Sequence, residues 1–205
     1  MGRYLTRIET DFIFQAINLS KCRSVMDVGA EAGRFSLLST KNKLDMIGID
    51  IDSYGLKRLK LKNKEVNVLL ADARKIPLRE KVLDAAFMIE VLDYIAELET
   101  ALSECSNALK PGGSLILSFG NNSSLKSKLR KLRGRTYQHS YKKVLHSLDK
   151  TGFKVKRKLG YNWLPFNRVS ENPFIPLLAK TEKLFGLRRL CRFSPWVLVY
   201  AVKPE

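Results

Sequence analysis

The sequence has few of the residues from which metal centres and disulfide frameworks are built. Its 205 residues include two histidines, His139 and His146, and three widely separated cysteines. An odd number of scattered cysteines argues against disulfides and against a paired-cysteine zinc site. Two histidines cannot form a metal centre without help from distant carboxylates. We therefore expect no bound metal, and a reducing compartment.

Long apolar runs are also missing. The run from Trp196 to Val202 is among the longest, and it has under half of the roughly 20 residues that a membrane-spanning helix needs. The N-terminus lacks the apolar core of a secretory leader, because Arg3, Arg7 and Glu9 interrupt it. These two absences predict a cytoplasmic protein without a transmembrane helix.

Acidic residues are scarce in only one part of the chain. Residues 1–119 carry 17 Lys and Arg against 16 Asp and Glu, whereas residues 120–205 carry 20 against 4. The length and an apolar fraction of 45% suit a single globular domain over 1–205. Any attraction for polyanions is therefore expected to come from the C-terminal half.

Apolar runs bounded by turn residues alternate with segments of helical pattern, which is typical of a parallel sheet covered by helices. The predicted strands are 24–28, 45–49, 66–70, 83–89, 114–119, 153–159 and 196–202. The predicted helices are 11–19, 34–39, 53–61 with Ser53 as its cap, 94–109, about 125–132, 140–150 and about 177–184. The last helix belongs to an insertion at about 161–194. The expected fold is α/β.

The strongest motif lies where the first predicted strand turns into a helix, and it reads Asp27-x-Gly29-x-x-x-Gly33. Glycines at these positions let the backbone approach a ligand where a Cβ would collide with it. Asp50 ends the second strand, where a carboxylate can accept hydrogen bonds from two ribose hydroxyls. Asp72 ends the third strand and is suited to an adenine amino group. Because strand ends of an open α/β sheet converge on one crevice, these residues predict a nucleotide-like site.

This ordered set resembles the class I S-adenosylmethionine-dependent methyltransferases, particularly the small-molecule group that includes quinone-biosynthesis enzymes. The resemblance runs from residue 24 to about 153 and includes two more stretches, EVLDYI at 90–95 and ALKPGG at 108–113. It implies a three-layer Rossmann-like fold with a seven-stranded, mostly parallel sheet whose last strand is antiparallel. It also implies S-adenosylmethionine as the cofactor, residues 1–119 as the cofactor-binding half and residues 120–205 as the acceptor-side half.

The resemblance carries cofactor-binding roles to nine positions of this sequence. They are Asp27, Gly29, Ala30, Gly33, Asp50, Ile51, Asp72, Ala73 and Glu90. The chain departs from the family pattern at Glu31, where a glycine is common, and at Tyr94, where a histidine is common.

A dedicated base is not required for methyl transfer, because the sulfonium is already activated and the main task is to position the acceptor. If the acceptor is a hydroxyl, His139, Tyr94 and Asp93 are the candidates for a base, by residue type and predicted proximity. The alternatives are structural: His139 would mark a helix entry, and Tyr94 would pack.

The basic residues of the C-terminal half, 120–205, do not decide between several kinds of partner. Its basic run and the aromatics among the later basic residues are Lys126, Lys128, Arg130, Lys131, Arg133 and Arg135, with Tyr137, Tyr141, Tyr161, Trp163 and Phe166. This pattern suits a small anionic or lipid-linked acceptor, a membrane surface or RNA. An RNA methyltransferase and a noncatalytic relative therefore remain alternatives, although an Asn-Pro-Pro-Tyr signature is missing. A nicotinamide enzyme ranks lower because Gly-x-Gly-x-x-Gly is absent.

Overall fold

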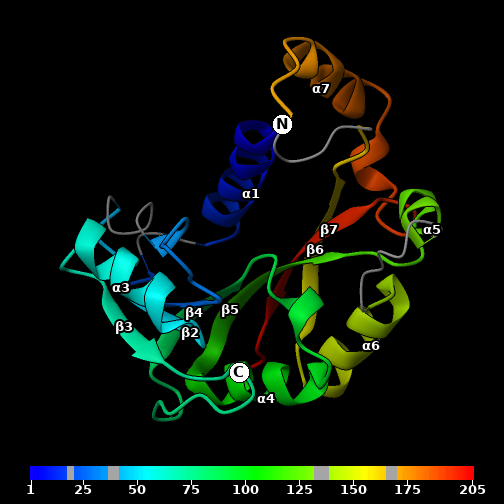
Figure 1. The fold of residues 1–205 in the computed structure, drawn as a ribbon. Coiled ribbons are helices and arrows are strands. Elements are labelled where there is room, and N and C mark those ends of the chain that lie inside the picture. The colour runs from blue at the N-terminus through cyan, green and yellow to red at the C-terminus, as the bar shows by residue number, and fades with distance from the viewer. Residues whose placement is uncertain (18–20, 37–41, 132–138, 165–169) are drawn as a thin grey trace.

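The computed structural model describes residues 1–17, 21–36, 42–131, 139–164 and 170–205. Seven strands form one sheet in the order β3-β2-β1-β4-β5-β7-β6 (Figure 1). The strands are β1 Ser24–Val28, β2 Asp45–Asp50, β3 Asn67–Leu70, β4 Leu83–Met88, β5 Leu109–Gly120, β6 Lys154–Tyr161 and β7 Trp196–Val202. All pairs are parallel except those of β7, which runs antiparallel to both neighbours. The predicted α/β fold, with its antiparallel last strand, is confirmed.

Helices cover both faces of the sheet, so the molecule has three layers (Figure 1). The helices are α1 Gly2–Ala16, α3 Ser53–Lys62, α4 Leu98–Ala108, α5 Leu125–Lys131, α6 Tyr141–Lys150 and α7 Ile175–Leu184. Apolar side chains of α4 and α6 pack on one face of the sheet. Those of α1 and α3, with Ile175 of α7, pack on the other. The central strands β1 and β4 are therefore buried from both sides, as a parallel sheet requires.

The N-terminal helix begins earlier than predicted. The sequence suggested 11–19, whereas α1 spans Gly2–Ala16. Leu5, Ile8 and Phe12 form a buried stripe at helical spacing that starts before Asp11, and burial of that stripe sets the start of the helix.

Two helix starts also differ from the predictions. Asp52, not Ser53, caps α3, because its carboxylate accepts from the N–H groups of Tyr54 and Gly55. The predicted helix 94–109 starts later than expected: α4 begins at Leu98, and a separate 3₁₀ turn, η1 Leu92–Tyr94, precedes it.

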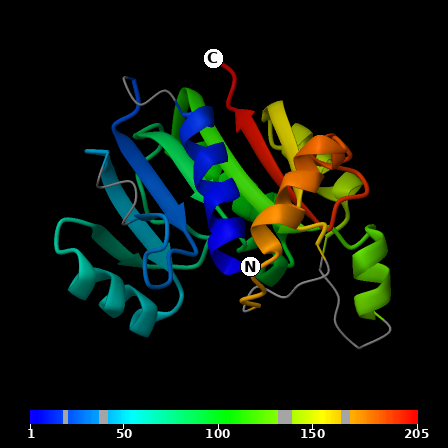
Figure 2. The same cartoon turned by 90° about the horizontal axis from the view of Figure 1, so that it is seen from above.

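The insertion between β6 and β7 contains α7 and a second 3₁₀ turn, η2 Leu187–Arg189. α7 lies beside α1 on the face of the sheet opposite α4 and α6 (Figure 2). No helix in the described ranges is long and apolar enough to cross a bilayer. The second half of the predicted helix 34–39, and the residues Arg133, Arg135, Tyr137 and Phe166, lie outside the described residues.

Candidate functional site

The glycine turn after β1 takes the conformation that its sequence predicts. Gly29 and Gly33 have φ angles of 75° and 85°, in the left-handed region that favours glycine. The N–H groups of Gly29 and Ala30 both donate to the carbonyl of Ile49 at the end of β2. A Cβ on Gly29 would lie 2.7 Å from Cγ2 of Val91, so the turn is also packed against the segment after β4. The turn is therefore fixed to two neighbouring strand ends.

Glu31, where the family pattern often has glycine, adopts a glycine-like backbone. Its φ angle is 46°, and its N–H donates to Oδ2 of Asp50 over 2.8 Å. The other oxygen of Asp50 accepts from the N–H of Asp52 over 2.9 Å. Each carboxylate oxygen can accept more than one hydrogen bond, so the two backbone bonds orient Asp50 without saturating it.

An exposed apolar side chain follows this carboxylate. Ile51 is 74% exposed, and Leu70, which is in register with Asp50 on the neighbouring strand β3, is 59% exposed. The carboxyl edge of β2 and β3 therefore combines an oriented carboxylate with uncovered apolar surface. A ribose joined to a flat base needs both of these features.

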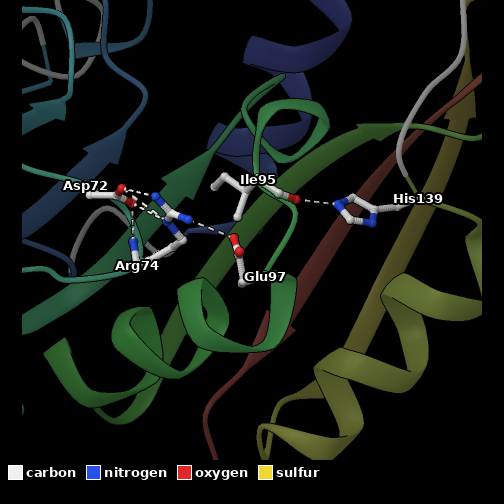
Figure 3. Close-up of polar contacts among 5 residues, drawn as sticks. All are labelled: Asp72, Arg74, Ile95, Glu97 and His139. Carbon is white, nitrogen blue, oxygen red and sulfur yellow. Dashed lines mark hydrogen bonds and ion pairs between the residues drawn. The ribbon is translucent and has the colours of Figure 1, made fainter.

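Asp72 lies beyond β3 and is held in an ion pair. Its carboxylate accepts from Nη2 of Arg74 over 2.6 Å, and Arg74 also reaches Glu97 over 2.8 Å (Figure 3). The hydrogen bond from Arg74 lowers the pKa of Asp72 to about 2. Ala73, between them, is buried. The predicted adenine role of Asp72 thus requires the carboxylate to accept from a ligand as well as from Arg74.

Asp27 of β1 has an internal partner. Its side chain is 2% exposed and accepts from both the N–H and the hydroxyl of Ser36, over 3.1 and 2.6 Å. Burial raises the pKa of Asp27 to about 6, against the opposing effect of the Ser36 bonds. The carboxylate therefore ties the segment after the glycine turn to the core, and its predicted contact with a cofactor stays a prediction.

Glu90 belongs to a cluster of charged residues that was not predicted from the sequence. Arg34 donates to Glu90 over 3.1 Å and to Glu9 of α1 over 3.0 Å. The other oxygen of Glu9 accepts from the hydroxyl of Tyr161, at the end of β6, over 2.9 Å. Burial, followed by repulsion from Glu9, raises the pKa of Glu90 to about 8. Residues from α1, from the glycine turn, from the end of β4 and from the end of β6 thus meet in one charged cluster.

One sequence signal could have revealed Glu9. It is fully buried within the apolar stripe of α1, where the helical pattern calls for an apolar residue. A carboxylate on such a face requires a buried partner, although the sequence does not say which one.

The three candidate bases occupy different surroundings. His139 is buried, and its Nε2 lies 2.7 Å from the carbonyl oxygen of Ile95 (Figure 3). Asp93 accepts from the N–H of Gly120, and Tyr94 is 84% exposed. Burial lowers the pKa of His139. The structure gives His139 and Asp93 partners within the fold, and it leaves Tyr94 open to solvent.

The described ranges contain no cluster of metal ligands. Within them, no group of three or more His, Cys, Asp or Glu side chains could hold a metal ion.

Comparison with known families identifies the central part of the chain. Residues 26–117 match the family described as "Methyltransferase domain". This stretch includes the glycine turn, Asp50, Asp72 and Glu90.

Among curated proteins, the chain is similar to several methyltransferases. It is 30% identical over 121 residues to 24-methylenesterol C-methyltransferase 3 of Arabidopsis thaliana, covering 56% of this chain and 33% of that enzyme. It is 28% identical over 182 residues to malonyl-[acyl-carrier protein] O-methyltransferase of Methylococcus capsulatus, covering 83% and 64%. It is 24% identical over 166 residues to ubiquinone biosynthesis O-methyltransferase of Acinetobacter baylyi, covering 71% and 69%. The chain thus spans about a third to two thirds of these enzymes.

Solved structures share the fold across nearly the whole chain. A SAM-dependent methyltransferase from Archaeoglobus fulgidus superposes with a TM-score of 0.68 at 20% identity, covering 99% of this chain and 95% of that one. An S-adenosylmethionine-dependent methyltransferase from Mesorhizobium loti gives 0.71 at 17% identity, covering 95% and 97%. These structures share the fold, and together with the family match and the curated relatives they confirm the predicted resemblance to S-adenosylmethionine-dependent methyltransferases.

Proposed function

We propose that this chain binds S-adenosylmethionine at the carboxyl ends of β1 to β4 and transfers its methyl group to a small, lipid-like or anionic acceptor. The observation that carries the proposal is the oriented carboxylate of Asp50. It is held by the N–H groups of Glu31 and Asp52, next to the exposed side chain of Ile51.

The residues present fit the cofactor. Asp50 retains lone pairs for two ribose hydroxyls, and Ile51 and Leu70 offer apolar surface for a base. Gly29 and Gly33 adopt the left-handed backbone that favours glycine, so the turn carries no side chain of its own at these two positions. S-adenosylmethionine supplies an activated methyl group on a sulfonium. The predicted contacts of Asp27, Asp72 and Glu90 belong to the same proposal.

The chain's own contribution to the reaction is positioning. Holding two reactants in line can supply roughly 7 to 11 kcal/mol of a barrier. Where the acceptor loses a proton, Glu90 does not take it near neutral pH, because its pKa of about 8 leaves its carboxyl already protonated there. His139 is already bonded to Ile95.

The acceptor class follows from the surroundings of the site and from the relatives. The relatives are named as methyltransferases of 24-methylenesterol, of malonyl-[acyl-carrier protein] and of ubiquinone biosynthesis. The insertion that contains α7 adds exposed apolar side chains and cations on the acceptor side. RNA is less favoured because none of these three relatives is named for methylation of RNA.

The test is transfer of radiolabel from methyl-labelled S-adenosylmethionine into a fractionated cell extract. We expect label in the lipid or small-anion fraction, and loss of that label with Asp50→Ala. Label confined to RNA would reject the acceptor class. Cofactor binding without transfer to any fraction would reject catalysis and favour a noncatalytic relative.

A further inference from the structure

The insertion between β6 and β7 exposes many large apolar side chains for its length. Six residues between 174 and 193 are 48 to 80% exposed. They are Phe174, Leu177, Leu184, Phe185, Leu190 and Phe193. Single exposed apolar residues are ordinary on protein surfaces, but several within one short segment indicate an interaction site.

The fold holds Leu177 and Leu184 of α7 outward. The carboxylate of Glu182 is fully buried, where it accepts from the hydroxyl of Tyr4 over 2.6 Å and from the N–H of Trp163 over 2.9 Å. Leu177 and Leu184 are seven residues apart and so lie on one side of the helix. Turning α7 to bury these leucines would expose Glu182 and break both hydrogen bonds. The hydrogen bonds of Glu182 with Tyr4 of α1 and with Trp163 therefore hold this side of α7 outward.

Cations border this apolar side. Lys180, Lys183, Arg189 and Arg192 are exposed, and none of them takes part in the ion pairs of the described residues. Between 171 and 193, the only acidic residues are the buried Glu182 and the exposed Glu171. Lys180 follows Leu177 by three positions and precedes Leu184 by four, so it lies next to both on the helix.

We infer that α7 and the residues through 193 form a docking surface for an anionic lipid bilayer. Leucine and phenylalanine side chains enter the boundary between headgroups and acyl chains, while the surrounding cations contact lipid phosphates. A second copy of the chain is disfavoured, because it would bring the same four cations into the interface. The surface binds without cofactor or acceptor, so the inference stands or falls separately from the proposed reaction.

The test is co-sedimentation of the full chain with vesicles, without cofactor. We expect binding to phosphatidylcholine vesicles that contain phosphatidylglycerol, little binding to pure phosphatidylcholine, and weaker binding as salt rises. The double variant L184S/F185S keeps the net charge and should bind roughly tenfold more weakly. The double variant K180Q/K183Q should also bind more weakly and lose much of its salt dependence.

Matched controls use α3 and the residues after it, at the other edge of the sheet. L61S removes a leucine that is 83% exposed, and K57Q/K64Q removes two exposed lysines. Both should bind vesicles like the unchanged chain. The inference is overturned if the controls weaken binding as much as the α7 variants, or if neutral and anionic vesicles bind equally. Failure to bind vesicles also overturns it, as does tighter binding to single-stranded RNA that L184S/F185S leaves unchanged.

Discussion

The imidazole of His139 donates from Nε2 to the backbone carbonyl of Ile95 over 2.7 Å. Ile95 belongs to the segment after β4 that also contains Glu97, to which Arg74 donates over 2.8 Å (Figure 3). Two contacts therefore hold this segment. His139, from the C-terminal half of the chain, holds Ile95, and Arg74 holds Glu97. This arrangement favours a structural role for His139.

His139→Ala should lower the free energy of unfolding by roughly 1 to 3 kcal/mol, because it leaves a buried carbonyl without its donor. Chemical denaturation measures this change. His146→Ala is the matched control, since that histidine is exposed on α6, and it should change stability by less than about 0.5 kcal/mol. A catalytic role would be indicated instead by unchanged stability with a large loss of methyl transfer.

Glu90 should make stability fall as pH rises. Burial and the charge of Glu9 raise its pKa from 4.5 to about 8, so the folded chain retains a proton that the unfolded chain has released between these values. The stabilising contribution is fully present below pH 4.5 and is lost as pH rises through about 8. Glu90→Gln should flatten the decline in the free energy of unfolding above about pH 6.5.

Asp27→Asn is the control for that measurement. Burial raises the pKa of Asp27 from 3.8 to about 6, so this variant should flatten the pH dependence in that lower window only. A decline above about pH 6.5 that survives in Glu90→Gln would contradict the assignment of the raised pKa to Glu90.

Alanine substitutions at Gly29 and Gly112 distinguish the cost of backbone strain from the cost of a steric collision. Their φ angles are 75° and 74°, but a Cβ would meet Val91 at 2.7 Å in the first case and nothing within 4 Å in the second. Gly112→Ala should therefore cost about 1 to 2 kcal/mol from the left-handed backbone alone. Gly29→Ala should cost a further 1 to 3 kcal/mol, roughly, from overpacking. Equal losses in thermal or chemical denaturation would show that Val91 moves aside without cost.

Most strands could be predicted from the sequence, because runs such as β1, β4 and β7 are short, apolar and bounded by turn residues. The position of Asp50 followed from the end of β2 in the same way. The start of β5 was missed, since it begins at Leu109 rather than at residue 114. The sequence could not show which residue caps α3, because Asp52 and Ser53 are both good capping residues. Only the backbone conformation decides between them. The cluster of Glu9, Arg34 and Glu90 joins residues far apart in the sequence, and periodicity carries no information about such pairs.

Glu31→Gly should raise stability by about 0.5 to 1 kcal/mol, because it relieves a left-handed backbone at a residue other than glycine. Affinity for S-adenosylmethionine should be retained, since the contact with Asp50 comes from the backbone N–H. Lys81→Gly, at a φ of 56° after β3 and away from the glycine turn, is the control for the stability gain. Loss of affinity in Glu31→Gly alone would assign the Glu31 side chain to the site.

The central claim is that S-adenosylmethionine binds at the strand ends through Asp50, and calorimetry tests it most directly. The unchanged chain should bind S-adenosylmethionine and its demethylated product at one site. Asp50→Ala should weaken binding roughly 10- to 100-fold, as expected for the loss of charge-assisted hydrogen bonds. Asp52→Ala, which removes the neighbouring helix cap, should lower stability and retain binding. A folded sample that binds neither compound, or an Asp50→Ala variant with undiminished affinity, would contradict the account.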